Sequence, residues 1–195
     1  MLLKQVYRIS FSLMIVGLVV LLAGCATSSG PYSPANSARR DTARAQELTS
    51  KAAELVFTDP EKAEPLLREA LAADLYHGPA HNNLGVLYLN AGRLYEAASE
   101  FEWARKLMPG HPDPRLNLAM TLEEAGRIDE ASEAYMTALE VYPNHLPTLM
   151  GLTRMQIRTQ SSDNRTIENL KTIVMRSDDP DWRQWAEREL IRLDR

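Results

Sequence analysis

Apolar residues recur at helical spacing over most of the chain beyond residue 42. From about Thr42 to Phe57 they stand three or four positions apart, at Ala45, Leu48, Ala52 and Leu55. This spacing is typical of one face of an amphipathic helix. The segment Ala63-x3-Leu67-x2-Ala70 predicts a second helix, and Pro65 inside it marks either the true start of that helix or a kink.

The C-terminal part of the chain predicts three more helices. The first begins near Leu149 and Leu152 and ends at a polar loop, residues 161–164. The second carries an apolar stripe at Ile167, Leu170, Ile173 and Val174. Asp179-Pro180 predicts the N-cap and first turn of the third. That helix contains Trp182-x2-Trp185 and a polar face with four arginines: Arg183, Arg188, Arg192 and Arg195. A polar outer face suits a helix that caps a stack.

An internal repeat of 34 residues occupies the middle of the chain. Shifting the sequence by 34 positions aligns Ala91-Gly92-Arg93 with Ala125-Gly126-Arg127, Pro109 with Pro143 and His111 with His145. This many identities at one offset indicate duplication of a structural unit. Gly92 and Gly126 fall where a first helix ends and a positive φ is needed. Pro109 and Pro143 end the second helix.

The repeat resembles the tetratricopeptide repeat family over residues 78–145. One copy reads His81-x2-Leu84-Gly85-x2-Tyr88, then Ala97-x3-Phe101 and Pro109. The second copy reads Arg115-x2-Leu118-Ala119-x2-Leu122, then Ala131-x3-Tyr135 and Pro143. The resemblance implies an all-α fold, a right-handed superhelical solenoid of antiparallel helix pairs closed by a C-terminal capping helix. Small residues such as Gly85 would let the two helices of a repeat cross closely.

The repeat pattern divides the folded part, residues 42–195, into five segments. They are a degenerate repeat (42–77), two clear repeats (78–111 and 112–145), a divergent repeat (146–179) and the capping helix (180–195). The divergent repeat lacks the pattern of small residues, so its helix packing is not predicted.

The N-terminus carries a different signal. Lys4 and Arg8 precede the uncharged apolar run 9–22, which is shorter than the roughly 20 residues that span a bilayer. Leu22-Ala23-Gly24-Cys25 then resembles the lipoprotein signal of bacteria. The resemblance implies cleavage of the signal peptide, residues 1–24, and a diacylglyceryl thioether and an acylated amine on Cys25. An uncleaved anchor helix is the alternative.

Residues 25–41 follow as a lipidated flexible tether rich in Ser, Pro, Gly and Ala. In the enterobacterial sorting pattern that the chain resembles, an aspartate after the cysteine retains a lipoprotein in the inner membrane. Ala26 stands there instead. The resemblance therefore implies a lipid-anchored protein on the periplasmic face of the outer membrane.

Charge and composition exclude several functions. The chain has a net charge of −4, and removal of residues 1–24 takes away Lys4 and Arg8 but no acid, which moves the charge to −6. This argues against nucleic acid as a partner. With Cys25 as the single cysteine, no internal disulfide forms.

No catalytic or metal site is predicted. His77 and His81 have the i, i+4 spacing of two metal ligands on one helix, but Gly78-Pro79 between them interrupts a continuous helix. His111 and His145 are equivalent repeat positions, so their recurrence reflects duplication. The sequence therefore predicts no enzyme, no small-molecule substrate, no metal and no cofactor other than the lipid on Cys25.

The family resemblance implies that a protein partner binds the concave face, which the first helices of the repeats form. The matching positions are Asn82, Val86, Leu89, Asn90, Leu116, Met120, Glu123, Glu124, Met150, Arg154, Ile157 and Arg158. This groove would be acidic in the middle and basic near its C-terminal end. An ordinary solvated face is the alternative. Reversing both arginines, Arg154 and Arg158, should then weaken an acidic partner and leave folding intact.

We expect a lipid-anchored periplasmic scaffold for protein–protein interaction. Among lipid-anchored repeat proteins the chain looks like those that assist pilus or secretin assembly, namely type IV pilotins and the repeat lipoproteins of tight-adherence pili. The alternative is an adaptor that recruits murein hydrolases or a periplasmic protease to the envelope. A third hypothesis is a cytoplasmic scaffold with an uncleaved N-terminus.

Overall fold

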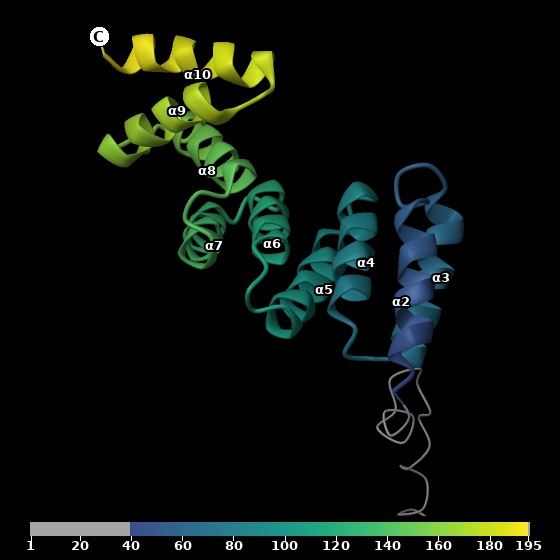
Figure 1. Cartoon of the computed structure of the whole chain (residues 1–195). Coiled ribbons are helices and arrows are strands. Elements are labelled where there is room, and N and C mark those ends of the chain that lie inside the picture. Colours follow the sequence, from purple (N-terminus) through teal and green to yellow (C-terminus); the bar gives the residue numbers. More distant parts are fainter. Residues whose placement is uncertain (1–39, 195) are drawn as a thin grey trace, which may run out of the picture. The chain divides into compact units, whose positions relative to one another are not determined.

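The computed structural model describes residues 40–194. The predicted signal peptide and the lipidation site at Cys25 lie outside these residues, as does all of the tether except Arg40 and Asp41. The described part is helical throughout and contains no strand (Figure 1). The helices are α2 (Thr42–Ala53), α3 (Pro60–Ala73), α4 (Gly78–Asn90), α5 (Leu94–Leu107), α6 (Asp113–Glu124), α7 (Ile128–Val141), α8 (Leu146–Arg158), α9 (Asn164–Arg176) and α10 (Pro180–Leu193). No helix between residues 40 and 194 is long and apolar enough to span a membrane.

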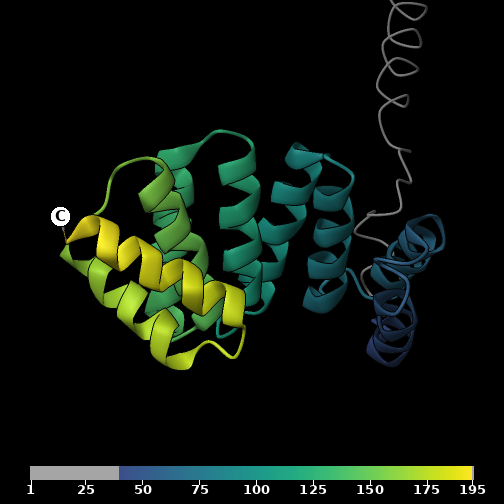
Figure 2. The ribbon, with the colours of Figure 1, turned by 90° about the horizontal axis from the view of Figure 1, so that it is seen from above.

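The helices pack in the order of a repeat solenoid. Each helix contacts the next along the chain, and the first helices of successive repeats also contact each other, α2 with α4, α4 with α6 and α6 with α8. Figure 2 shows these pairs from above, with α10 beside α9. The all-α solenoid fold predicted from the 34-residue repeat is confirmed.

The two helices of a repeat cross closely because glycine, which has no side chain, occupies position 85. A Cβ built on Gly85 of α4 would lie only 2.6–2.9 Å from three ring atoms of Phe101 on α5. Phe101 itself is fully buried, as is Ala97 one turn earlier. Tyr135, the equivalent of Phe101 in the next repeat, instead lies 2.7 Å from a Cβ built on Gly151 of α8. Phe101 therefore fills space within its own repeat, whereas Tyr135 fills space against the following repeat.

The turns between helices follow the predicted chemistry. Gly92 and Gly126 have φ of 70° and 75°, the left-handed conformation that glycine adopts without a steric penalty. Helices α5 and α7 end at Leu107 and Val141, each two residues before its proline. Asp179 caps α10 by accepting a hydrogen bond from the Asp181 amide. The predicted N-cap of the last helix is confirmed.

The boundaries of the first repeat differ from prediction. Helix α2 ends at Ala53 rather than near Phe57, because residues 54–58 form the turn that reverses the chain. Helix α3 begins at Pro60 with Asp59 as its N-cap, so Pro65 lies inside the helix and does not mark its start. The folded unit also begins at Arg40, since the Asp41 amide donates to the Ala73 carbonyl at 2.9 Å.

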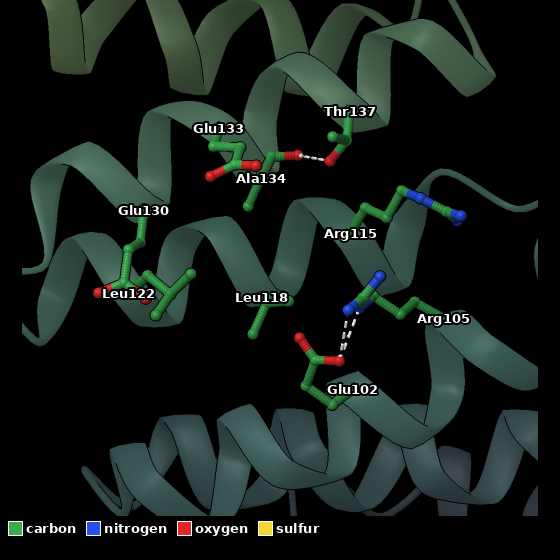
Figure 3. Close-up of a pocket in the computed structure, with 9 residues that line it drawn as sticks. All are labelled: Glu102, Arg105, Arg115, Leu118, Leu122, Glu130, Glu133, Ala134 and Thr137. Atoms are coloured by element: carbon green, nitrogen blue, oxygen red, sulfur yellow. Dashed lines mark hydrogen bonds and ion pairs between the residues drawn. The ribbon is translucent and has the colours of Figure 1, made fainter.

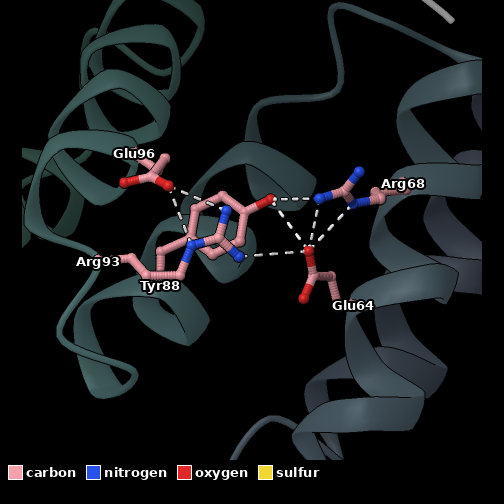
Figure 4. A network of polar contacts seen from close by, with 5 residues as sticks. All are labelled: Glu64, Arg68, Tyr88, Arg93 and Glu96. Carbon is pink, nitrogen blue, oxygen red and sulfur yellow. Dashed lines mark hydrogen bonds and ion pairs between the residues drawn. The ribbon is translucent and has the colours of Figure 1, made fainter.

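Two polar networks stabilise the first repeat, and one of them also joins it to the next repeat. In the first, Arg68 of α3 donates to the Tyr88 hydroxyl of α4 at 3.2 Å, and that hydroxyl donates to Glu64 of α3 at 3.3 Å (Figure 4). The Arg93 guanidinium lies 4.1 Å from the centroid of the Tyr88 ring and pairs with Glu96 of α5. This network joins α3, α4 and α5.

The second network surrounds Asp74, which has a fully buried side chain. Its carboxylate accepts from the Arg40 guanidinium at 2.9 and 3.1 Å, from the Thr42 hydroxyl at 2.9 Å and from the Tyr76 amide at 3.0 Å. Burial alone would raise the pKa of Asp74, but these hydrogen bonds outweigh it and hold the pKa below its ordinary value. The ionised carboxylate therefore ties both ends of the first repeat together.

We expect Asp74 to make the domain sensitive to acid. Because its pKa is lower in the folded state, its contribution to stability is present above the ordinary value of about 4 and is lost as the pH falls through the lower folded value. Thermal unfolding of the wild type and of Asp74→Asn between pH 2.5 and 7 measures this contribution. The difference in Tm should be largest at pH 7 and shrink below about pH 4. A difference in Tm that does not change with pH would contradict this role of Asp74. Glu47→Gln, at an exposed pair with Lys51, is the control.

Candidate partner-binding surface

The three first helices α4, α6 and α8 form one continuous surface. The Asn117 side-chain amide of α6 donates to the Asn82 side chain of α4 at 3.0 Å. Farther along, Arg158 of α8 pairs with Glu123 of α6 at 3.0 Å. The structure therefore brings the predicted residues of all three helices together; we call this set of twelve residues the first-helix surface.

Exposure along the first-helix surface is uneven. The exposed members are Asn90, Met120, Glu124, Arg154 and Arg158. Asn82, Val86, Leu89, Met150 and Ile157 are half-buried. Leu116 and Glu123 are buried, with 9% and 7% of their surfaces accessible, so the prediction that they offer contacts to a partner needs correction. Leu116 belongs instead to the main apolar core.

Glu123 has an internal role. One carboxylate oxygen accepts from the Tyr135 hydroxyl at 2.7 Å, and the other faces the guanidinium groups of Arg158 at 3.0 Å and Arg154 at 3.8 Å. The two arginines are about half exposed. Glu123 from the predicted acidic middle of the groove therefore pairs with the arginines of the predicted basic end. Because two arginines face one carboxylate, this group of three side chains carries a net charge of +1.

Tyr135 is the member of this network that the sequence analysis missed. Burial raises the pKa of its hydroxyl, and the hydrogen bond to Glu123 raises it further, so the group stays a donor. The earlier repeat has Phe101 at the equivalent position. A tyrosine at a buried repeat position where the preceding repeat has phenylalanine indicates that a hydrogen-bond acceptor lies near its hydroxyl.

Helix α10 extends the surface beyond the predicted residues. Trp182 and Trp185 pack edge to face with ring centroids 5.1 Å apart. Together with Arg154, Asp179 and Asp181 they line a pocket of about 350 Å³. Beyond capping the stack, this helix therefore supplies aromatic surface next to the basic end of the first-helix surface.

The ring of His81 is occupied by structural contacts. The His81 ring lies between Glu100 at 2.6 Å and the Leu75 carbonyl at 2.9 Å, and it stacks on Trp103 with ring centroids 5.8 Å apart. His77 precedes α4 as its N-cap, so the two rings do not share a helix. Burial lowers the pKa of His77. Between residues 40 and 194, no three metal-ligating side chains come close enough to hold an ion.

The opposite side of the solenoid carries grooves between successive second helices. One of about 230 Å³ lies between α5 and α7, over Leu118 and Leu122 of α6 (Figure 3). Its rim is charged, and two of the rim residues, Glu102 and Arg105, pair with each other at 2.6 Å. Met136, Leu139 and Leu149 are among the residues that line a second groove between α7 and α9.

Comparison with known proteins supports the fold. Residues 92–154 match the tetratricopeptide repeat family. No curated protein sequence matches the chain significantly. Among solved structures, the chain is similar to the first repeat domain of Spaghetti (RPAP3) bound to the HSP90 peptide SRMEEVD. The identity is 18%, the match covers 64% of this chain and 98% of that one, and the TM-score is 0.59.

Two other solved structures share the architecture. MamA of Desulfovibrio magneticus RS-1 is 16% identical, with 65% of this chain and 72% of that chain covered and a TM-score of 0.58. The Thermobaculum terrenum O-GlcNAc transferase is 24% identical over 74% of this chain, with a TM-score of 0.62. The chain spans only 26% of that enzyme's length.

These observations define the class of protein. The chain has the tetratricopeptide repeat fold, which serves as a scaffold for protein–protein interaction.

Proposed function

We propose that this chain is a lipid-anchored periplasmic scaffold that holds a protein segment on its first-helix surface while a pilus or secretin channel assembles at the outer membrane. The observation that carries the proposal is the continuity of that surface. Three first helices present half-buried apolar groups beside two half-exposed arginines. Leu22-Ala23-Gly24-Cys25 supports the anchor.

The chemistry of the surface favours an acidic segment with apolar residues. Val86, Leu89 and Ile157 supply partly buried apolar area, which drives association. Arg154 and Arg158 together outnumber Glu123, the carboxylate they share, so donors remain for an incoming carboxylate. A lipid anchor would raise the local concentration of the scaffold at the membrane, and a modest affinity would then suffice.

The anchor and the partner are tested separately. Labelled palmitate should be incorporated into the wild type and not into Cys25→Ala. Equal labelling of both would contradict the proposed lipid anchor and the outer-membrane location that depends on it. The partner is tested by affinity capture of the lipidated full-length chain from gently solubilised envelopes, followed by mass spectrometry. We expect a secretin or pilus component that is lost with Cys25→Ala.

The same capture experiment tests the first-helix surface. The double variant Asn90→Asp/Met120→Asp adds two charges at exposed positions of the first-helix surface and should reduce recovery of the partner at least tenfold. Met175→Asp/Ile191→Asp, at side chains on α9 and α10 with 76% and 62% of their surfaces exposed, adds the same two charges and is the matched control. Undiminished capture by the double variant would exclude this surface. Recovery of murein hydrolases or a protease would replace assembly with the adaptor function.

A further inference from the structure

The groove between α7 and α9 lies on the side of α8 that faces away from the first-helix surface. Leu149 and Leu152 of α8 form its floor, whereas Arg154 and Arg158 point to the other side of the same helix, as the 3.6-residue period requires. Met136 of α7 lines one wall, and Asn169 of α9 the other. The groove encloses about 360 Å³, within the range of ligand-binding pockets.

The corresponding groove one repeat earlier has a different character. Glu102 and Arg105 stand at the positions of Met136 and Leu139, 34 residues before them, and pair with each other across one turn. The earlier groove is therefore a charged surface with internal ion pairing (Figure 3). The later groove has replaced that pair with two apolar side chains, and 43% of the Met136 surface is exposed. Flexible, polarisable methionine suits an adaptable contact.

Asn169 supplies a second, independent observation. Only 8% of its surface is exposed, and its Nδ2 atom is buried without a hydrogen-bond partner among residues 40–194. Buried amide donors almost always have an acceptor, so this orphan group needs an explanation. An acceptor delivered by a bound molecule would complete its hydrogen bonding.

The charges at the rim are also available. Glu140 of α7 and Arg165 of α9 are both exposed, and neither forms an ion pair with another residue of the described part of the chain. Opposite walls of the groove thus carry opposite charges. A bound segment would place a basic residue toward α7 and an acidic residue toward α9, which sets its direction.

We propose that this groove binds an extended segment of a partner protein. Two aliphatic side chains of the segment lie on Met136 and Leu139, above the buried Leu149 and Leu152, and one of its backbone carbonyls accepts from the Asn169 amide. An extended segment fits better than a helix, because the carbonyls inside a helix already accept hydrogen bonds from their own chain. The protein then has two binding surfaces on opposite sides of the same repeats.

A peptide selection tests the groove directly. A displayed library of random 12-residue peptides is selected on the full-length chain in detergent, and enriched sequences are synthesised with a fluorescent label. We expect unstructured peptides with two aliphatic residues and flanking charges. Their Kd should rise at least tenfold with Met136→Glu, an exposed position that leaves the fold intact, and stay within twofold with Glu102→Gln at the equivalent position of the earlier groove.

An ester scan of the best peptide tests the role of Asn169. Replacing a backbone amide by an ester weakens the carbonyl as an acceptor. One ester position should reduce affinity about fivefold for the wild type and leave affinity for Asn169→Leu unchanged, a coupling that a purely structural asparagine would not produce. Three outcomes overturn the proposal: no enriched peptide, binding insensitive to Met136→Glu, or an ester scan without such a position. Enriched peptides that are helical by circular dichroism overturn the choice of occupant.

Discussion

Reversing the charges of Arg154 and Arg158 together is expected to destabilise the domain by about 3 kcal/mol. Glu123 is buried, with 6% of its side chain exposed, and these two guanidinium groups are the cations that pair with it. Removing the partner of a buried charge costs roughly 3–5 kcal/mol, and the half-exposed arginines place this case at the low end. The expected fall in Tm is roughly 6–12 °C.

A rescue variant separates this cause from a general effect of charge. Adding Glu123→Gln to the double reversal removes the uncompensated carboxylate and should restore most of the stability, because the Tyr135 hydroxyl can still donate to the amide oxygen. Arg183→Glu/Arg188→Glu makes the same change in net charge on the exposed side of α10 and should shift the stability by less than about 0.5 kcal/mol. If both double reversals gave the same Tm, the Glu123 network would contribute nothing.

This expected result corrects the prediction from sequence. From sequence alone, reversal of the two arginines was expected to leave folding intact. The structure adds the buried carboxylate between them. Any loss of partner binding by that variant must therefore be judged against its loss of stability, which is why the capture experiment uses the exposed residues Asn90 and Met120 instead.

Gly85→Leu is expected to destabilise the domain by about 3 kcal/mol, at the upper end of the cost of overpacking a core. A Cβ at this position lies 2.6 Å from the Phe101 ring, and the ring is fully buried and cannot move into solvent. A leucine would add three more carbon atoms to a space that does not hold one. Urea unfolding followed by circular dichroism gives the change in free energy.

Two variants check the reason for that loss. Gly110→Leu is the matched control, since a Cβ at this exposed turn has no atom within 4 Å, and it should change stability by less than about 0.5 kcal/mol. Phe101→Ala makes a cavity beside Gly85 and should cost about 3–5 kcal/mol alone. The double variant Gly85→Leu/Phe101→Ala should be more stable than the sum of the two changes predicts, because the leucine enters the cavity. Strict additivity would show that the two positions do not meet.

The periodic features of the fold were readable without a structure. The 34-residue repeat predicts which residues are small, which are aromatic and where each helix ends. Gly85 and Gly92 take the predicted roles. These features are local or recur at a fixed spacing, so two copies of the repeat are enough to reveal them. The first repeat, which has no clear copy of the pattern, is also where the helix boundaries were misplaced.

The candidate binding surface was only partly predictable. Repeat positions assign Asn82, Met120 and Arg154 to the first helices α4, α6 and α8, and these helices contact each other in that order. The fate of Glu123 depends on Tyr135, twelve residues later on α7, and on arginines of the next repeat. No periodicity encodes such a contact, since each of these residues differs from its counterpart in the neighbouring repeat.

The sequence by itself determined the class of fold, the order of the repeats and the turns between them, since all three depend on helix periodicity and on residues with restricted backbone conformations. Only the tertiary structure decided which charged groups are available to a partner and which are used internally. It paired Glu123 with Arg154 and Arg158, brought Trp182 beside the same surface and left the Asn169 amide without an acceptor. The physical reason is that burial and pairing are set by side chains from separate helices, and their distances exist only once the repeats have stacked.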